Sequence, residues 1–365
     1  MISLVPEPYR TAIAFILVLG VLIFIHELGH LLAARWRGVR VERFSIGFGE
    51  RVAAWTDKRG TEWTVGWIPL GGYVRLHGQN GLPKDSAYPG ETFYDKPVLD
   101  RALIVVAGPV ANFLLAALLF MSIFAFNGKP YTSSVITRVS EGSPAEMGGL
   151  KVGDHIVEAD GIVIGRLDTF QDVVRLHPGT SMSMVVERDG ARVSLEAVPD
   201  SHPVLHGRAM GWLGMAGGIT AYETMSPIRA MSESLAFTGE SSWRMLSALS
   251  ELVTGKRSAS ELGGPIRIAQ MSGEVASNGL LPLLGFTAFM SVNLALMNLL
   301  PVPSLDGGHL VFYAIEAVRG KPLSPRVADI GLRMGMACLI SFMAWTTLND
   351  LSGVGLFDWL VSLFA

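Results

Sequence analysis

The feature that most constrains this chain is an apolar run, at about residues 11–34, that carries the sequence His26-Glu27-Leu28-Gly29-His30 near its end. A helix needs roughly 20 apolar residues to cross a bilayer, and this run is long enough. An ionisable side chain at membrane depth costs at least a few kcal/mol, so three such side chains within five positions need a reason. The run therefore predicts a membrane-spanning helix that carries a polar site.

The spacing of the two histidines predicts a metal site. On a helix, His26 and His30 lie on one face, so both imidazoles can reach a single ion. Glu27 lies next to that face, as in the H-E-x-x-H arrangement of two zinc ligands and a general base. The alternative is a helix end whose histidines meet water. This alternative can explain one polar side chain that reaches toward water. It does not readily explain three polar side chains at the spacing of metal ligands.

Composition agrees with a membrane protein. Half of the residues are hydrophobic and 17% are charged, which is too apolar for an ordinary soluble protein. The net charge of −3 gives no case for nucleic acid, and the single cysteine, Cys338, excludes a cysteine-rich zinc site. A signal peptide beginning at Arg10 is rejected, because cleavage near Ala33 would remove the histidine motif. Any zinc must then be held by histidine and carboxylate ligands.

Two basic clusters predict the topology. The first cluster comprises Arg35, Arg37, Arg40 and Arg43, and the second comprises Arg319, Lys321, Arg326 and Arg333. Basic residues beside membrane helices mark the cytoplasmic side. With spans at about residues 11–34, 101–126, 280–300 and 331–348, both clusters fit one orientation, in which the polar region before the third span is extracytoplasmic.

Residues 39–76 predict a β-hairpin. Apolar residues alternate on either side of a turn at residues 57–60, and Trp55, Trp63 and Trp67 suggest contact with the membrane interface. One interpretation is a sheet near the active site whose edge strand binds an unwound substrate. The other is a small soluble hairpin with an aromatic face. In the following span, Asn112 is equally explained as an interhelical contact or as a substrate contact.

Residues 128–218 resemble a PDZ domain. The pattern runs through Gly142-Ser143-Pro144-Ala145, residues 149–154 and 156–161, a helix near 170–176, and strands near 182–187 and 192–197. Gly211, Leu213 and Gly214 look like the loop that binds a peptide carboxylate in circularly permuted bacterial versions. PDZ domains bind extended peptides by strand addition, although such a groove can equally serve as a steric gate. Residues 226–253 then predict an amphipathic helix, either on the membrane surface or against this module.

The third span leads into a second polar motif, Asn298-Leu299-Leu300-Pro301-Val302-Pro303-Ser304-Leu305-Asp306-Gly307-Gly308-His309. Its prolines break the helix, and irregular backbone at membrane depth is tolerated only inside protein or along a cavity. Zinc in a hydrolase takes three protein ligands and a water. The residues alone leave Asp306 and His309 as candidates for the third ligand.

The order of these motifs, with HELGH first, a PDZ module next and NLLPVPSLDGGH last, resembles the site-2 protease family, in the layout of its bacterial regulator-of-sigma-E branch. The resemblance implies zinc ligands His26, His30 and Asp306, with Glu27 as the base. It implies that Asn298 holds substrate or stabilises the oxyanion. The best-known enterobacterial members carry two PDZ modules, whereas this chain has room for one, which puts the gating and substrate filter in doubt rather than the chemistry.

The predicted fold is a polytopic α-helical membrane protein of about four spans, with a membrane-associated β-hairpin and one extramembrane PDZ domain. The predicted divisions are a first span with its motif at 1–36, the hairpin region at 37–78, a cytoplasmic loop at 79–100, a second span at 101–127, the PDZ domain at 128–218, an amphipathic helix and connector at 219–279, a third span with the LDG motif at 280–310, and a loop, fourth span and tail at 311–365.

The resemblance implies an intramembrane zinc metalloprotease, with one zinc per chain, in the bacterial inner membrane. It implies cleavage of single-span proteins already trimmed by another protease, such as an anti-sigma factor or signal-peptide remnants. Two other functions remain as rivals. A metal transporter would need further ligands along a path, and none are found. A proteolytically inactive scaffold with a PDZ module would not need two intact motifs.

Overall fold

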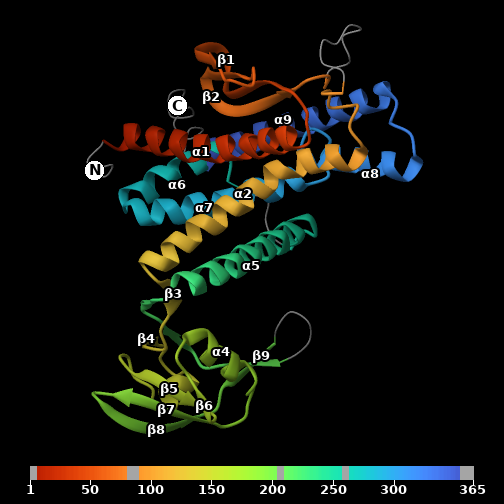
Figure 1. Cartoon of the computed structure of the whole chain (residues 1–365). Helices are drawn as coiled ribbons and strands as arrows, with labels where there is room; N and C mark the ends of the chain where they lie inside the picture. The colour runs from red at the N-terminus through yellow and green to blue at the C-terminus, as the bar shows by residue number, and fades with distance from the viewer. Residues whose placement is uncertain (1–5, 80–89, 204–208, 257–262, 354–365) are drawn as a thin grey trace, which may run out of the picture. The chain divides into compact units, whose positions relative to one another are not determined.

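The computed structural model describes residues 6–79, 90–203, 209–256 and 263–353 (Figure 1). The chain divides into two compact units. The membrane unit comprises Met1–Ile123 with Pro227–Ala365, and the PDZ-like unit comprises Phe124–Ser226. The predicted tail after residue 353 and the middle of the predicted loop at 79–100 lie outside the described residues.

Four of the described helices are long and apolar enough to cross a bilayer, at the places where the sequence predicts spans. They are α1 (Glu7–Trp36), α2 (Val98–Phe126), α7 (Leu280–Leu299) and α9 (Pro325–Gly353). Most of the apolar side chains of α9 are exposed in the structure, as expected where a helix faces lipid. The chain is therefore a multi-pass membrane protein.

Two further helices lie where the sequence predicts a connector and where it predicts the end of the third span and the loop after it. The connector contains α6 (Pro265–Ser277), and the LDG motif opens a separate helix, α8 (Asp306–Arg319), instead of ending the third span. Helices of this length are marginal alone and depend on tertiary packing. Figure 1 shows α6 beside α1, and Asp350 of α9 accepts hydrogen bonds from the backbone N–H groups of Gly264 (2.9 Å) and Arg267 (3.0 Å). These partners lie far away in the sequence, which explains why local pattern missed both helices.

The predicted amphipathic helix is α5 (Pro227–Val253). Its partners differ from both sequence interpretations, because it packs on membrane helices. The ring of Phe237 lies edge-on to Phe120 of α2 and to Phe289 of α7, with centroids 4.9 and 6.0 Å away. Aromatic pairs of this geometry add about 0.5–1.5 kcal/mol beyond the area that they bury.

The predicted hairpin consists of β1 (Val41–Thr56) and β2 (Glu62–Leu76), paired antiparallel. Asp57 organises the turn, since its Oδ1 accepts hydrogen bonds from the N–H groups of Arg59 and Thr61. Its Oδ2 accepts from the indole of Trp63 and pairs with Arg35 at the end of α1. Burial alone would raise the pKa of Asp57, but these donors hold it well below its usual range. The turn is thereby fixed to the membrane helix that carries the histidines.

The pairing of β1 leaves one end of β2 at an edge. Phe44 lies opposite both Val74 and Trp63, and Ser45 lies opposite both Tyr73 and Thr64. The first half of β1 is therefore flanked on both sides by parts of β2. Among the described strands, residues 72–76 pair with β1 alone and form an edge. Phe44 is also buried against Phe24 of α1 and anchors the sheet on that helix.

The PDZ-like unit has the elements that the sequence predicts. The expected helix is α4 (Leu167–Arg175), and the expected strands are β7 (Met182–Arg188) and β8 (Ala191–Ala197). A four-stranded sheet in the order β6-β5-β7-β8 includes β5 (His155–Ala159) and β6 (Ile162–Val163). The remaining elements are β3 (Lys129–Thr132), β4 (Ile136–Val139), α3 (Pro144–Met147), β9 (Asp200–Pro203), β10 (Ala209–Trp212), β11 (Met215–Gly217) and β12 (Thr220–Glu223).

One buried ion pair ties the PDZ-like sheet to the loop before it. The two carboxylate oxygens of Asp154 accept hydrogen bonds of 2.7 and 2.8 Å from Arg188 of β7. Although burial opposes the charged form, these bonds and the N–H of Lys151 lower the pKa of Asp154. Asp154 belongs to the glycine-rich pattern on which the PDZ resemblance rests, so that pattern has a structural role here.

Candidate active site

The two motif histidines lie on adjacent turns of α1 and point to one place. Their Nε2 atoms are 3.2 Å apart, and the rings meet edge-on. His26 is buried and His30 is partly buried. The Nδ1 of His30 lies 2.9 Å from the backbone oxygen of Ile104 in α2. A carbonyl can only accept, so His30 carries its proton on Nδ1 and presents the lone pair of Nε2.

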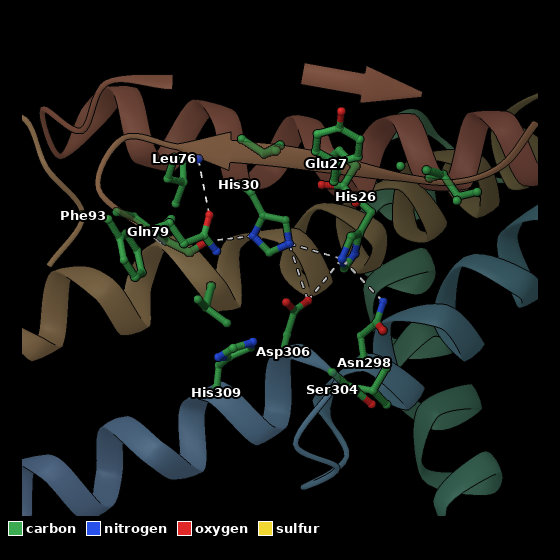
Figure 2. A pocket seen from close by; sticks show the side chains of 18 of the residues that line it. His26, Glu27, His30, Leu76, Gln79, Phe93, Asn298, Ser304, Asp306 and His309 are labelled. Carbon is green, nitrogen blue, oxygen red and sulfur yellow. Dashed lines mark hydrogen bonds and ion pairs between the residues drawn. The ribbon is translucent and has the colours of Figure 1, made fainter. Parts of the chain in front are cut away.

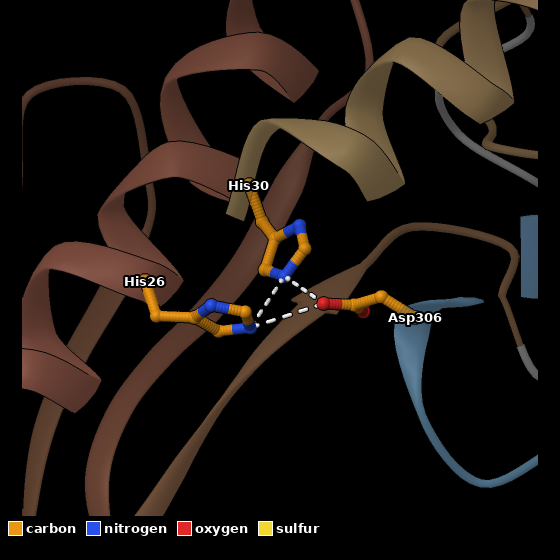
Figure 3. Close-up of side chains that lie close together, drawn as sticks. All are labelled: His26, His30 and Asp306. Atoms are coloured by element: carbon orange, nitrogen blue, oxygen red, sulfur yellow. Dashed lines mark hydrogen bonds and ion pairs between the residues drawn. The ribbon is translucent and has the colours of Figure 1, made fainter. Parts of the chain in front are cut away.

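Asp306 brings a carboxylate to the same place from the other end of the chain (Figure 3). Its Oδ2 lies 3.1 Å from Nε2 of His26 and 3.5 Å from Nε2 of His30. Asp306 is the first residue of α8, where the positive end of the helix dipole favours a negative charge. A side chain at Gly307 or Gly308 would overlap backbone oxygens of residues 299–302, so the two glycines permit this sharp entry.

A buried ion pair fixes α8 against α2. Arg101 donates two hydrogen bonds, of 2.7 and 3.1 Å, to the carboxylate of Glu316, and it also stacks over the ring of Tyr313. Bidentate pairs of this kind add geometric specificity as well as energy. The pair therefore fixes the position of α8, which begins with Asp306, relative to α2, which contacts His30.

The donor set fits zinc. One ligand atom from each of His26, His30 and Asp306 lies within 4.8 Å of the others. The buried Oδ2 of Asp306 has no hydrogen bond of acceptable geometry, although both imidazoles are near it. Two imidazole nitrogens and one carboxylate, with a position left for water, form the donor set of hydrolytic zinc sites.

Glu27 lies beside the donor set, against β2. A side chain at Gly72 would come within 3.2 Å of Cγ of Glu27, and Val74 lines the same cavity as Glu27. Figure 2 shows Glu27 and His26 projecting from the same stretch of α1. The edge segment of β2 therefore reaches the candidate base.

A cavity of about 350 Å³ encloses these groups. Its lining comes from α1, β2, α2, α7, α8 and the proline-rich loop, so segments from both ends of the chain form it. The polar and titratable residues in the lining are His26, Glu27, His30, Tyr73, Gln79, Asn298, Ser304, Asp306, His309 and Tyr313. The candidate ligands, the candidate base and the edge segment of β2 therefore line one cavity.

Asn298 and His309 lie in the cavity at different places (Figure 2). The Nδ2 of Asn298 is 3.5 Å from Nε2 of His26, so its amide borders the donor set. His309 projects from the next turn of α8 and is not part of the three-residue cluster. The geometry thus favours Asp306 over His309 as the third ligand.

Small residues on α1 and α2 make the site compact, and sequence reasoning missed their role. A Cβ at Gly29 would overlap the backbone oxygen of Ala107, and a Cβ at Gly108 would overlap both histidine rings. Small residues permit close approach of membrane helices, but the sequence does not show that the histidine rings occupy the space beside Gly108.

The predicted peptide loop of the PDZ-like unit lines a separate cavity of about 240 Å³. Gly211, Leu213 and Gly214 lie there beside Val174 and Arg175 of α4. Gly214 has φ of +72°, which favours glycine. These residues lie in the other unit from the zinc ligands.

Comparisons with known proteins match nearly the whole chain. The family model "Peptidase family M50" matches residues 14–342. A relative in Agrobacterium fabrum that is named as a zinc metalloprotease is 39% identical, over 94% of this chain and 96% of its own. Metalloprotease MmpA of Caulobacter vibrioides is 38% identical over 96% and 98%, and protease RseP of Yersinia pestis is 32% identical over 93% and 98%. A solved PDZ domain from Listeria innocua covers 25% of this chain at 18% identity, with a TM-score of 0.21.

Substituting Gly108 by alanine should disrupt the site. The new methyl group would overlap the ring of His30, so we expect zinc affinity to fall by at least about tenfold, the lower range for disturbed ligand geometry. Gly20→Ala is the matched control, because Gly20 lies on α1 with open space around its Cβ position. Competition with a chromogenic chelator measures the affinity. Equal affinity in both variants would contradict the described packing.

Proposed function

Because the chain belongs to peptidase family M50, the site-2 protease family, we propose that this zinc metalloprotease cleaves peptide bonds within the transmembrane segments of single-span membrane proteins. The observation that carries the proposal is the place of the site. His26, His30 and Asp306 converge beside Glu27 in a cavity between membrane helices, near the end of α1 that carries the basic cluster.

We propose that His26, His30 and Asp306 are the ligands of the single zinc ion. When bound, zinc would lower the pKa of a water molecule to about 7, so that its deprotonated, nucleophilic form would be available at neutral pH. Glu27 takes the proton as the water oxygen adds to the scissile carbonyl carbon. Glu27 then passes this proton to the amide nitrogen, and the C–N bond breaks. The Asn298 amide lies where it can hold the substrate or donate to the oxyanion.

Substituting Glu27 by glutamine should abolish cleavage and leave zinc binding intact. General bases contribute about 10²- to 10⁴-fold, so we expect at least about a 100-fold loss. The assay is cleavage of a tagged single-span substrate by purified protein in detergent, with zinc measured in the same samples. His26→Ala and a zinc chelator are the controls that should remove both zinc and activity.

The same variant separates the rival functions. A metal transporter should keep most of its transport in Glu27→Gln, and a scaffold should be unaffected by it. Cleavage that survives both Glu27→Gln and the chelator would overturn the assignment of the site.

The edge of β2 is proposed to hold the substrate extended. A helix hides its peptide bonds, so a transmembrane substrate must unwind before cleavage. Residues 72–76 form an edge among the described strands, and this segment borders the cavity through Gly72, Tyr73 and Val74. Added strands gain affinity from main-chain hydrogen bonds. The exposed Trp67 and Ile68 on the same hairpin fit a sheet in contact with the membrane.

Backbone methylation of a substrate peptide tests strand addition. N-methyl groups at alternate residues beside the scissile bond remove the N–H groups that face the edge, and we expect kcat/KM to fall at least about tenfold, through several bonds of about 1 kcal/mol each. Methylation at the intervening residues should be tolerated, because successive N–H groups in a strand point to opposite sides. A loss that is equal in both registers would argue against pairing with β2.

The PDZ-like unit is proposed to lie on the periplasmic side of the inner membrane, with the zinc site toward the cytoplasm. The basic residues after the motif of α1 and those between the end of α8 and the first turns of α9 support this orientation. The unit would exclude substrates with bulky periplasmic domains, so that proteins trimmed by another protease enter. Anti-sigma factors and signal-peptide remnants are the proposed substrate classes.

Removing the unit should let untrimmed substrates enter. Replacing residues 134–218 by two glycines keeps the ends of the deletion together, because Ser133 and Ile219 are already joined by a hydrogen bond of 3.0 Å and the β3–β12 ladder lies directly beside them. We expect the deletion variant to cleave untrimmed and trimmed substrates alike, in reconstituted vesicles. The filter proposal fails if cleavage of the untrimmed substrate is unchanged.

A further inference from the structure

Asn112 is a completely buried amide in α2 with an incomplete set of hydrogen bonds. Its Nδ2 position lies 3.3 Å from Nδ1 of His26, and its Oδ1 has no hydrogen-bond partner. A buried polar atom without a partner costs about 1–3 kcal/mol. In either orientation of the amide the end that faces away from His26 has no partner, so the reason for an asparagine here lies at the end that faces His26.

The tautomer of His26 indicates what the Asn112 amide does there. Nε2 of His26 is the atom that faces Asp306 and His30, so a neutral imidazole bound to zinc through Nε2 carries its proton on Nδ1. A donor opposite Nδ1–H repels it, whereas an acceptor satisfies it. Rotating the Asn112 amide by half a turn exchanges its two ends and places Oδ1 where Nδ2 is drawn.

We propose that Asn112 is a positioning residue for the zinc site, whose side-chain oxygen accepts a hydrogen bond from Nδ1–H of His26. The bond fixes the tautomer and the ring orientation that zinc binding through Nε2 requires. The inference rests on the proposed function, in that it takes His26 as a zinc ligand. It adds a residue outside both metal-binding motifs.

The other histidine, His30, has at its Nδ1 an acceptor of the kind that the proposal gives to His26. Nδ1 of His30 lies 2.9 Å from the backbone oxygen of Ile104. Ile104, Gly108 and Asn112 follow one another at intervals of four residues and so share one face of α2. Gly108 lies between the two acceptors and makes room for both rings. One face of α2 therefore orients both histidines of α1.

An interhelical contact alone does not require this side chain. The hydroxyl of Ser291 in α7 donates to the backbone oxygen of Asn112 at 2.7 Å, so the link between α2 and α7 uses the main chain. The side chain of Asn112 instead faces α1. Leucine, which has the same number of side-chain heavy atoms in the same branched pattern, would preserve the main-chain link and leave Nδ1–H of His26 unsatisfied.

Zinc affinity of the purified full-length protein in detergent tests the proposal, by competition with a chelator. We expect Asn112→Leu to bind zinc about 10- to 100-fold more weakly, the usual effect of removing a partner of a ligating histidine. Asn112→Asp keeps an acceptor oxygen and should bind within about threefold of wild type or more tightly, since carboxylates are common partners of such histidines. Ser291→Ala, which removes the main-chain link, is the matched control and should be unchanged.

Two further readouts separate positioning from folding. The melting temperature of the metal-free protein should be similar in Asn112→Asp and wild type, and the visible spectrum of the Co²⁺-loaded protein should change in Asn112→Leu but not in Ser291→Ala. A tenfold loss of affinity in Asn112→Asp, or wild-type affinity in Asn112→Leu, overturns the proposal. His26→Ala in the same assay tests the ligand assignment by itself: zinc retained there would contradict the proposed function, whatever Asn112 does.

Discussion

The structure depends on one constraint, which is that two imidazoles and a carboxylate must meet in an apolar interior. Oδ2 of Asp306 lies within 3.5 Å of both Nε2 atoms and has no hydrogen bond of acceptable geometry. An isolated buried charge is costly unless it is paired or coordinates a metal. The proposed zinc ion would resolve that conflict, and it would join α1 to α8 across nearly the whole sequence. The proposed metal site would thus offset the free-energy cost of placing these three polar side chains at membrane depth.

Much of the remaining architecture keeps those three side chains in place. Glycines at positions 29 and 108 let α1 and α2 approach until the histidine rings touch the second helix. The Arg101–Glu316 pair holds the helix that begins with Asp306. Phe44 anchors the hairpin on α1, so the edge of β2 lies against Glu27. Each contact is between segments distant in the chain, and together they give the cavity its lining.

The sequence predicted the features that depend on residues close together in the chain. The spacing of His26 and His30, the four apolar runs, the turn at Asp57 and the PDZ pattern each predicted what the structure contains. The helices α6 and α8 were not predicted, because their stability comes from partners elsewhere in the chain. The orienting role of Asn112 was also beyond reach, since nothing in its neighbourhood in the sequence shows that His26 is opposite it. The residues alone left Asp306 and His309 open as the third ligand, the family resemblance implied Asp306, and the fold places Asp306, not His309, in the three-residue cluster.

Zinc K-edge X-ray absorption on the full-length protein tests the ligand set most directly. The account predicts one zinc in a four-coordinate site with two imidazole nitrogens at about 2.0–2.1 Å and the remaining ligands oxygen. Asp306→Asn should weaken zinc binding and change the oxygen shell, whereas His309→Ala should leave the spectrum unchanged. A third imidazole that disappears in His309→Ala, or a spectrum that Asp306→Asn does not alter, would contradict the central claim.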